Sequence, residues 1–493
     1  MSGFDNTISE GWSDYERERV EAALASIAAV INVTFTITAD PNADFQLVKS
    51  DDPFSSSGEL GYFYLPNFTG QSVGVFNSDG FGWTEDGLRD GGTGYTTIVH
   101  ELLHGLGLAH PHDGPNVLDG VTSAFGSFGN NNLNQGVYTT MSYNSGNFGT
   151  PNFDRGSEAG PMALDIAALQ QIYGANMSHA TGDDIYELDN SNSDGAAWEA
   201  IWDAGGNDTI RYSGTADTVI DLREATLQYG PGGGGFVSSA SNVSGGYTIA
   251  TGAIIENAIG GSGNDTLIGN DVANSLTGNG GNDTFMGGAG GDNIDGGSGN
   301  DDASGGTGDD DIDLGSGNDT ADGNSGGDEI ETASGTNTIY GGSGNDMITG
   351  GTGFDTIFGG SGDDTINGNG GNDALFGGRG DDTIDGGANN DRITGGLGAD
   401  TLTGGSGADD FIFESVSDSR AGAGNSDTIQ DFEVGVDDID LSLINGLSLA
   451  DDVTLTTSGG DTIVGIDVNG DDIDDMEIVI AGVTGLGASD FIL

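Results

Sequence analysis

Residues 96–110 read Thr-Thr-Ile-Val-His-Glu-Leu-Leu-His-Gly-Leu-Gly-Leu-Ala-His, and this stretch decides how the N-terminal part of the chain is organised. His100 and His104 stand four positions apart, so a helix places both on one face, where two imidazole nitrogens can bind one metal ion. Gly107 suits the left-handed turn at the end of such a helix, and the turned chain brings His110 back as a third ligand. The spacing therefore predicts a buried helix that carries a zinc site of three histidines.

The alternative is a helix that happens to contain three structural histidines. The whole chain has five histidines, and three of them fall within the eleven residues 100–110, which favours a shared role. Glu101 neighbours the first of them and is the natural base for a water molecule polarised by the metal. Val99, Leu102 and Leu103 cover the remaining faces, as in a helix buried in a core.

The chain is strongly acidic, with 10 Lys and Arg residues against 79 Asp and Glu residues and a formal net charge of −69. This charge disfavours nucleic acid and anionic membranes as partners. Clustered carboxylates need counter-ions, and calcium is the cation they favour. The absence of cysteine excludes disulfides and thiolate zinc sites. No apolar run is long enough to span a membrane, and the N-terminus lacks the pattern of a secretory signal, so we expect no membrane insertion.

The first 175 residues are expected to form a mixed α+β domain. Its first helix begins after Ser13, a residue that suits a helix cap. Its last helix has Ile166, Leu169 and Ile172 on the expected inward face. The expected elements are a helix over residues 13–31, strands over 32–37, 44–48, 61–65 and 72–77, the histidine helix, and a helix over 161–174.

A second pattern runs from Gly260 to Ile412, where a nine-residue period holds its phase for 153 residues, or 17 units. The sixth position is Asp in 15 units and Asn in two, and the eighth is a large apolar residue in 15 units and Ala in two. Gly-rich turns adopt positive φ angles and expose carbonyl oxygens, to which each Asp adds charge, as calcium prefers. The last three residues of a unit should form a short strand with the eighth side chain inward. Two units then make one coil of a parallel, calcium-binding roll.

The predicted calcium ligands of the roll are its aspartates and several turn glycines, so that one ion lies between units two apart, such as those of Asp346 and Asp364. They are Gly261, Gly263, Asp265, Asp283, Asp292, Asp301, Asp310, Asp319, Asp328, Gly342, Gly344, Asp346, Gly351, Gly353, Asp355, Gly360, Gly362, Asp364, Asp373, Asp382, Asp391, Asp400 and Asp409. Without calcium, repulsion among the carboxylates should leave this region disordered. A flexible Gly/Asp linker is the alternative, but a linker does not hold phase over 17 units.

The histidine motif, followed by Pro111 and later by Met141-Ser142-Tyr143, resembles the serralysin family of metzincin proteases. Astacins share the tyrosine but are disulfide-bonded, which the absence of cysteine disfavours. The resemblance implies that zinc is bound by His100, His104, His110 and, as a fifth and labile ligand, Tyr143.

The resemblance also implies roles in catalysis. Glu101 takes a proton from the attacking water and passes it to the leaving amine, and the Tyr143 phenol stabilises the oxyanion. Met141 forms a tight turn beneath the zinc ligands. Tyr143 could instead be an ordinary buried aromatic residue. His112 and His179 are expected to be exposed loop residues rather than ligands.

Two further features concern the start of the chain. Residues 61–65 match the family's edge strand, along which an extended peptide binds through main-chain hydrogen bonds. Family members usually carry a strand before the first helix, inside the sheet. Residues 1–11 hold no convincing strand, so either they pair in a way that the sequence does not reveal or the first strand is missing.

The regions on either side of the repeats also resemble serralysin segments. Residues 202–210 resemble the segment that joins the catalytic domain to the repeats, which makes Asp208 a further expected calcium ligand. Residues 427–432 and 438–442 alternate polar and apolar side chains, like strands that cap a solenoid. The terminal Asp490-Phe491-Ile492-Leu493 resembles the family's C-terminal signal for a type I secretion system.

The expected fold class is multidomain, with an α+β metzincin catalytic domain followed by an all-β parallel β-roll. The expected domains are the zinc metalloprotease domain over residues 1–175, a connector over 176–259, the roll over 260–412, and a cap with the secretion signal over 413–493.

These features predict a secreted, extracellular zinc endopeptidase that is stabilised by calcium and acts as a monomer. The expected cofactors are one catalytic Zn²⁺ and several structural Ca²⁺ ions, and the expected partners are protein or peptide substrates and the type I secretion machinery. The main alternative is a calcium-dependent adhesin or surface-layer protein with an inactive metzincin domain. A repeat-bearing lipase is a further alternative.

Overall fold

The structure is a computed structural model. It describes residues 4–8, 11–39, 43–50, 61–64, 72–78, 83–113, 121–123, 133, 135–142, 144, 157–192, 196–228, 232–422 and 424–493. The chain forms two compact units, Met1–Gly261 and Ser262–Leu493. The finer domain boundaries within these units stay predictions.

The first unit contains a five-stranded sheet with the strand order β2-β1-β3-β5-β4. Its strands are β1 (Phe4–Ile8), β2 (Phe35–Ile37), β3 (Phe45–Ser50), β4 (Gly61–Tyr64) and β5 (Ser72–Asn77). All neighbours are parallel except β4, which runs antiparallel to β5 at one edge. The position of β4 agrees with the edge strand expected at residues 61–65.

Residues 1–11 contain a strand, since β1 lies between β2 and β3, so the first of the two alternatives given for them is correct: they pair in a way that the sequence does not reveal. The sequence of β1, Phe-Asp-Asn-Thr-Ile, lacks the alternation that marks a half-buried strand. The strand is defined by its two parallel partners, which lie about 30 and 40 residues further along the chain. Local sequence patterns carry no signal of such pairing.

Among the described residues, three long helices accompany the sheet, namely α1 (Asp14–Val30), α2 (Thr93–Gly105) and α3 (Ala163–Tyr173). α1 begins with a capping box, in which the Ser13 hydroxyl accepts the Glu16 N–H and the Glu16 carboxylate accepts the Ser13 N–H. α3 lies within the predicted range and ends at Gly174, which has a φ of +81°. The expectation for Ile172 is wrong, since this side chain is 54% exposed at the end of the helix.

The remainder of the first unit consists of short strands and loops. The strands are β6 (Ile185–Glu187), β7 (Trp198–Ile201), β8 (Thr209–Arg211), β9 (Thr218–Asp221), β10 (Ser239–Ala240), β11 (Gly246–Ile249) and β12 (Asn257–Ile259). β7 pairs in parallel with β11, and β8 pairs in parallel with both β6 and β12. Trp198 of β7 is buried against Val137 and Met162, which ties this segment to the region around α3.

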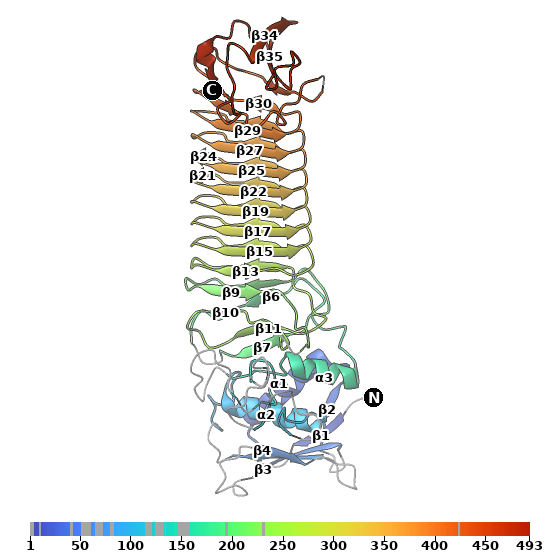
Figure 1. Cartoon of the computed structure of the whole chain (residues 1–493). Helices are drawn as coiled ribbons and strands as arrows, with labels where there is room; N and C mark the ends of the chain where they lie inside the picture. The colour runs from blue at the N-terminus through green and yellow to red at the C-terminus, as the bar shows by residue number, and fades with distance from the viewer. Residues whose placement is uncertain are drawn as a thin grey trace. The chain divides into compact units, whose positions relative to one another are not determined.

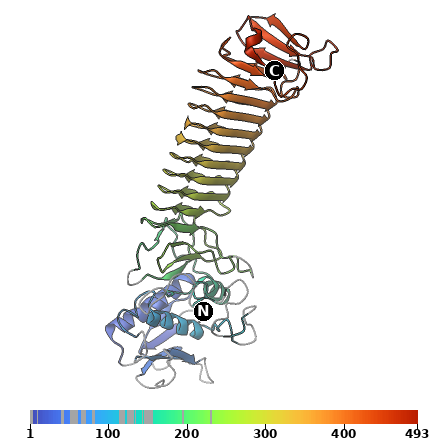
Figure 2. The ribbon, with the colours of Figure 1, turned by 60° about the vertical axis from the view of Figure 1, so that its left-hand side comes forward.

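The second unit is built from two long sheets, whose strands appear as successive rungs in Figures 1 and 2. The strands are parallel, apart from antiparallel pairing among three strands within residues 453–480. One sheet contains β13 (Thr266–Ile268), β15 (Thr284–Ala289), β17 (Asp302–Thr307), β19 (Thr320–Ser325), β22 (Thr338–Ser343), β25 (Thr356–Ser361), β27 (Ala374–Arg379), β29 (Arg392–Leu397), β31 (Asp410–Ile412), β33 (Asp438–Asp440) and β37 (Phe491–Ile492). The other contains β14 (Ser275–Thr277), β16 (Asn293–Asp295), β18 (Asp311–Asp313), β20 (Glu329–Glu331), β23 (Met347–Thr349), β26 (Thr365–Asn367), β28 (Thr383–Asp385), β30 (Thr401–Thr403), β32 (Asp427–Ile429), β36 (Met476–Ile480), β35 (Asp461–Ile466) and β34 (Val453–Ser458). The short strands β21 (Ser334–Gly335) and β24 (Thr352–Gly353) pair with each other, and a 3₁₀ turn spans Ala488–Asp490.

The register of these sheets follows the repeat. Thr338 of β22 pairs with Thr356 of β25, eighteen residues later, so two nonapeptides make one coil. The eighth residue of every unit is buried; Ile339, Ile357 and Leu375, for example, have no exposed surface. The long parallel sheets are therefore consistent with the predicted β-roll, whose core is the stack of these side chains.

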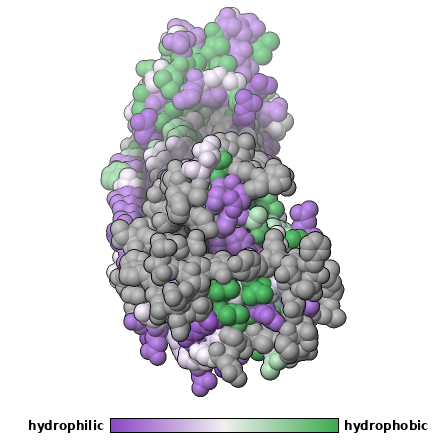
Figure 3. Space-filling model, turned by 90° about the horizontal axis from the view of Figure 1, so that it is seen from below, coloured by the Kyte–Doolittle hydropathy of each residue, from purple (hydrophilic) through white to green (hydrophobic). Residues whose placement is uncertain are grey.

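Two surface features complete the fold. Within the described residues, no helix is both long and apolar enough to cross a membrane. Figure 3 shows hydrophobic and hydrophilic residues side by side on the described surface, without one continuous hydrophobic face in that view.

Candidate metal centre

The structure brings the three predicted histidines together. His100 and His104 lie on α2, and their rings are 4.8 Å apart between centroids. The Nε2 atom of His110 lies 3.0 Å from that of His100 and 3.0 Å from that of His104. Gly107, with a φ of +101°, makes the turn that returns His110 to the helix.

Each of the three rings is held through its other nitrogen. The Nδ1 atom of His100 lies 2.8 Å from the Thr140 carbonyl oxygen, and that of His104 lies 2.8 Å from the Leu108 carbonyl oxygen. The Nδ1 atom of His110 lies 2.6 Å from an oxygen of Asp113. Carbonyl and carboxylate oxygens only accept hydrogen bonds, so each Nδ1 carries the proton and each Nε2 presents a lone pair.

This arrangement suits a bound cation. Burial, followed by the charge of the neighbouring His104, lowers the pKa of His100 to about 3, and burial also lowers the pKa of His104 and of His110. All three imidazoles are therefore neutral near pH 7. Neutral lone pairs that meet at 3.0 Å repel one another unless a positive charge lies among them. Three imidazole nitrogens with oriented second hydrogen bonds are a donor set that fits zinc.

Of the two predicted catalytic residues, the structure describes one. Glu101 follows His100 on α2 and is buried, with 6% of its surface exposed. The prediction for Tyr143 falls on a residue outside the described part of the chain. His179 is exposed as expected, whereas His112 is half-buried with its ring stacked on His110, 5.0 Å away between centroids.

Met141 is buried, and the turn that contains it is fixed by a carboxylate of α3. Asp165 accepts the Thr139 hydroxyl at 2.6 Å and the Thr140 N–H at 2.7 Å. It also accepts the Met162 N–H at 3.0 Å. Burial raises the pKa of Asp165 to about 6, and these hydrogen bonds oppose that shift. Since the Thr140 carbonyl holds His100, Asp165 fixes the backbone that orients a predicted zinc ligand.

Sequence reasoning missed Asp113 and Asp165. Asp113 lies three residues after His110, a spacing that could have suggested a partner for its Nδ1. Asp165 stands 25 residues from Thr140, and no local pattern links the two.

In the second unit, the aspartates of the repeat form two ladders. The Asp346 N–H donates to Oδ1 of Asp364 at 2.9 Å, and the Asp364 N–H donates to Oδ1 of Asp382 at 2.9 Å. Burial, followed by the charges of neighbouring aspartates, raises the pKa of Asp364 to about 6 and that of Asp382 to about 8. Among the described residues, no hydrogen-bond donor reaches the second oxygen, Oδ2, which is buried in Asp283, Asp292, Asp301, Asp310, Asp319, Asp328, Asp346, Asp355, Asp364, Asp373, Asp382, Asp391, Asp400 and Asp427.

The glycines of the repeat bring backbone carbonyls close to these carboxylates. A Cβ atom at Gly359 would lie 2.5 Å from Oδ2 of Asp364 and 2.7 Å from the Gly377 carbonyl oxygen. At Gly344, whose φ is +132°, a Cβ would lie 1.7 Å from the Gly326 carbonyl oxygen. No side chain fits at either position. Buried carboxylate and carbonyl oxygens packed in this way are a donor set that fits calcium.

The ladders continue past the last repeat, which the sequence did not reveal. The Asp400 N–H donates to Asp427 at 2.9 Å, and the Asp409 N–H donates to Asp437 at 3.1 Å. These pairs are 27 and 28 residues apart instead of 18, because longer segments separate the strands after Ile412. The Asp-Thr-Ile and Asp-Asp-Ile runs at β32 and β33 repeat the Asp-x-apolar pattern of the units and were the available signal.

Asp208 lies in an acidic cluster within the first unit. Ligand atoms of Asp184, Asp203 and Asp208 all lie within 4.8 Å of one another. Asp208 has no exposed surface, and its Oδ1 accepts the Asp184 N–H at 2.8 Å. Its Oδ2 has no hydrogen-bond donor in the part of the chain that the structure describes. Burial raises the pKa of Asp208 to about 6. The cluster thus places two further carboxylates, those of Asp184 and Asp203, beside the residue that the sequence predicts as a calcium ligand.

The family model and the sequence relatives agree on one family. Residues 163–493 match the family described as Peptidase M10 serralysin C terminal. Serralysin from Photorhabdus sp. (strain Az29) is 35% identical over 253 residues, which are 48% of this chain and 51% of that protein. Metallopeptidase AprA from Pseudomonas marginalis is 33% identical over 261 residues, 48% of this chain and 52% of that protein.

The chain thus spans about half the length of the curated relatives it matches. Among solved structures, the AlgE6R3 subunit of the Azotobacter vinelandii mannuronan C5-epimerase is 28% identical over 30% of this chain and 78% of that chain, with a TM-score of 0.20. The family match covers all of the second unit and the end of the first, from α3 onward. The chain belongs to the serralysin family of M10 peptidases.

Proposed function

We propose that the chain is a secreted, zinc-dependent endopeptidase that calcium stabilises. The observation that carries the proposal is the convergence of three imidazole Nε2 atoms whose Nδ1 atoms are each bound to an acceptor oxygen. Membership of a peptidase family supports the reaction class.

In this proposal His100, His104 and His110 hold the zinc ion. Zinc held there would supply a Lewis acid for a water molecule and for the scissile carbonyl group. Glu101 lies on the same helix and within the buried site, so its carboxylate accepts a proton from the attacking water and returns it to the leaving amine. The phenol of Tyr143 stabilises the oxyanion and serves as a labile ligand.

Calcium is proposed to hold the second unit and the Asp208 cluster. The support is the set of buried Oδ2 atoms, each of which lacks a donor while Oδ1 accepts a backbone N–H. A divalent cation compensates the charge of such carboxylates where hydrogen bonds do not. Asp184 and Asp203 join Asp208 as proposed ligands.

The proposed substrates are proteins and peptides outside the cell. β4 is an edge strand next to β5, and an edge strand can accept an extended peptide through main-chain hydrogen bonds. Export by a type I secretion system and action as a monomer complete the proposal. In the folded chain, two residues of the proposed signal, Phe491 and Ile492, form β37 against β33.

The test is hydrolysis of azocasein by the calcium-replete protein, with and without a chelator selective for zinc. Glu101→Gln should lower kcat about 100-fold or more, because it removes the proton acceptor. Glu18→Gln, an exposed position on α1, is the matched control and should retain activity. Undiminished hydrolysis by Glu101→Gln would remove the mechanism, and absence of hydrolysis by the zinc-loaded wild type would favour the adhesin alternative.

A further inference from the structure

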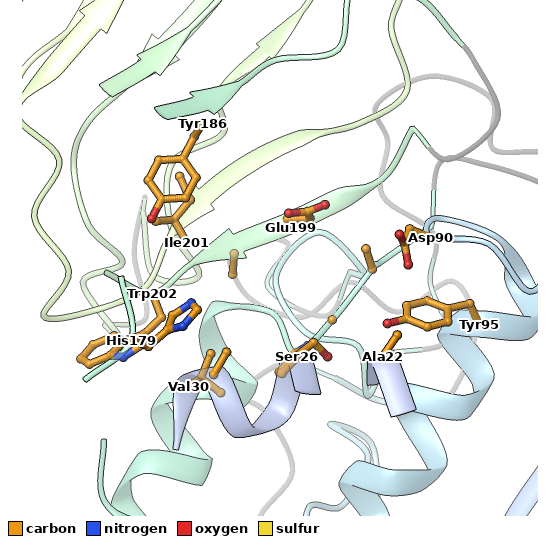
Figure 4. Close-up of a pocket in the computed structure, with 15 residues that line it drawn as sticks. Ala22, Ser26, Val30, Asp90, Tyr95, His179, Tyr186, Glu199, Ile201 and Trp202 are labelled. Carbon is orange, nitrogen blue, oxygen red and sulfur yellow. The ribbon is translucent and has the colours of Figure 1, made fainter. Parts of the chain in front are cut away.

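A pocket of about 340 Å³ lies in the first unit, separate from the histidine site. One side is α1, which contributes Ser26 and Val30, and the other is β7 with the residues around it (Figure 4). Its volume is at the lower end of the range of small-molecule sites. Neither the histidines of the metal centre nor Glu101 line it.

One end of the pocket is acidic. Glu199, Asp90 and the Tyr95 hydroxyl lie on the same side of the close-up in Figure 4. Asp90 is paired with Arg19, at 3.3 Å, and Arg19 also lies over the Tyr95 ring. Of the two carboxylates in the pocket, Glu199 is therefore the one that has no ion pair within the described residues.

The surroundings of Glu199 favour a bound cation. Burial, followed by the charges of Asp90 and Asp189, raises the pKa of Glu199. The residue nevertheless keeps exposed surface, so a ligand can reach its carboxylate. Among the described residues, neither Glu199 nor Asp90 belongs to a group of three or more His, Asp or Glu side chains whose ligand atoms lie within 4.8 Å of one another. An organic cation, which spreads its charge over a larger head group, therefore fits better than calcium.

The opposite end of the pocket is lined mainly by aromatic rings. Figure 4 shows His179 and Trp202 there, with Tyr186 and Ile201 nearby. The polar atoms of the two large rings are already used, since the Tyr186 hydroxyl donates to Asp203 at 2.6 Å and the Trp202 N–H donates to the Asn176 carbonyl at 3.1 Å. These side chains consequently offer their ring surfaces, on which a flat apolar group can pack.

We propose that this pocket binds an organic cation, an ammonium or amidinium group carried on a flat apolar body. The charged group lies against Glu199 and the body lies between Trp202 and Val30. The same chemistry occurs in a free aromatic amine and in a basic side chain that follows an aromatic residue in a peptide.

The experiment is a titration of the full chain, loaded with zinc and calcium, followed by calorimetry. Phenethylamine and benzamidine are the free-amine probes, the peptide N-acetyl-Phe-Lys-amide is the side-chain probe, and 2-phenylethanol is the neutral control. Saturable binding of at least one cationic probe is expected, at least about tenfold tighter than that of 2-phenylethanol. The probe that binds more tightly identifies the source of the cation.

Variants locate the binding. Glu199→Gln should lower the affinity for the bound probe about tenfold or more, because the substitution removes the charge of the side chain and keeps its shape. Glu21→Gln removes one charge from α1 outside the pocket and should leave the affinity within about twofold. Equal weakening by both variants would show general attraction to an acidic protein and overturn the proposal. Equal affinity for 2-phenylethanol and the amines, or no binding of any cationic probe, would overturn it as well. The readout is binding, so a failure here is distinct from a failure of the proposed peptidase activity.

Discussion

Asp165 offers a sharp test of how the metal centre is built, because it acts on His100 only through the backbone of Thr140. Its carboxylate accepts three hydrogen bonds, from the Thr139 hydroxyl and from the backbone N–H groups of Thr140 and Met162. The Thr140 carbonyl in turn accepts Nδ1–H of His100. We predict that Asp165→Asn weakens zinc binding without unfolding the first unit.

The expected losses of stability and of zinc affinity follow from these hydrogen bonds. The asparagine of this variant would keep one carbonyl oxygen for the two backbone donors, but its amide group would face the Thr139 hydroxyl. The loss of one bond to a charged acceptor amounts to about 2 kcal/mol. In a unit of this size, such a loss lowers the melting temperature by about 5 °C. Changes to residues that orient metal ligands reduce metal affinity about 10- to 100-fold, and Asp165 acts through one further residue, so we expect about tenfold.

The assay is competition for zinc between the calcium-replete protein and a chromophoric chelator. Asp14→Asn is the matched control, since Asp14 is exposed in the first turn of α1 and should leave zinc affinity unchanged. Thermal unfolding measured in parallel gives the decrease in melting temperature that the substitution causes. If Asp165→Asn lowers stability as expected but binds zinc as tightly as wild type, the reasoning that links Asp165 to His100 through Thr140 is refuted.

Three further predictions concern the same chain. The folded roll favours the protonated form of its buried carboxyl groups, as the raised pKa of Asp382, about 8, shows. Ionisation of these groups therefore destabilises the fold. Without calcium, the roll should lose β signal in circular dichroism as the pH rises from about 4 to 8. Calcium should reverse this trend, and equal signal at both pH values in a chelator would contradict it. Asp364→Asn should lower the number of bound calcium ions measured by calorimetry and raise the calcium concentration needed for folding. Asp363→Asn, at an exposed position in the same turn, should change neither quantity. Identical calcium titrations of the two variants would count against calcium binding by the ladder. Asp113→Asn should weaken zinc binding about tenfold, because Asp113 holds His110 through its Nδ1; an unchanged affinity would show that this bond does not orient the ligand.

The sequence predicted most where a pattern is local and repeated. The roll could be predicted because the nine-residue period fixes both the buried residue and the aspartate in every unit, and the register of eighteen residues follows from it. The two histidines of α2 could be predicted because the helical period places them on one face. In both cases the information lies within a few residues of the chain.

The features that the sequence did not predict depend on contacts between distant segments of the chain. β1 is a strand because β2 and β3 flank it, and its own sequence is mostly polar. Asp427 and Asp437 extend the ladders across segments of irregular length, which broke the period used to find the earlier aspartates. The second partners of the histidines are largely backbone carbonyls, and the sequence does not show where a carbonyl points.

The central claim is that His100, His104 and His110 bind one zinc ion. The most direct measurement is elemental analysis by mass spectrometry of the calcium-replete chain after dialysis against metal-free buffer. The wild type should retain about one zinc ion per chain, and His104→Ala should retain almost none while keeping its calcium. Absence of zinc from the wild type, or equal zinc in His104→Ala, would contradict the account.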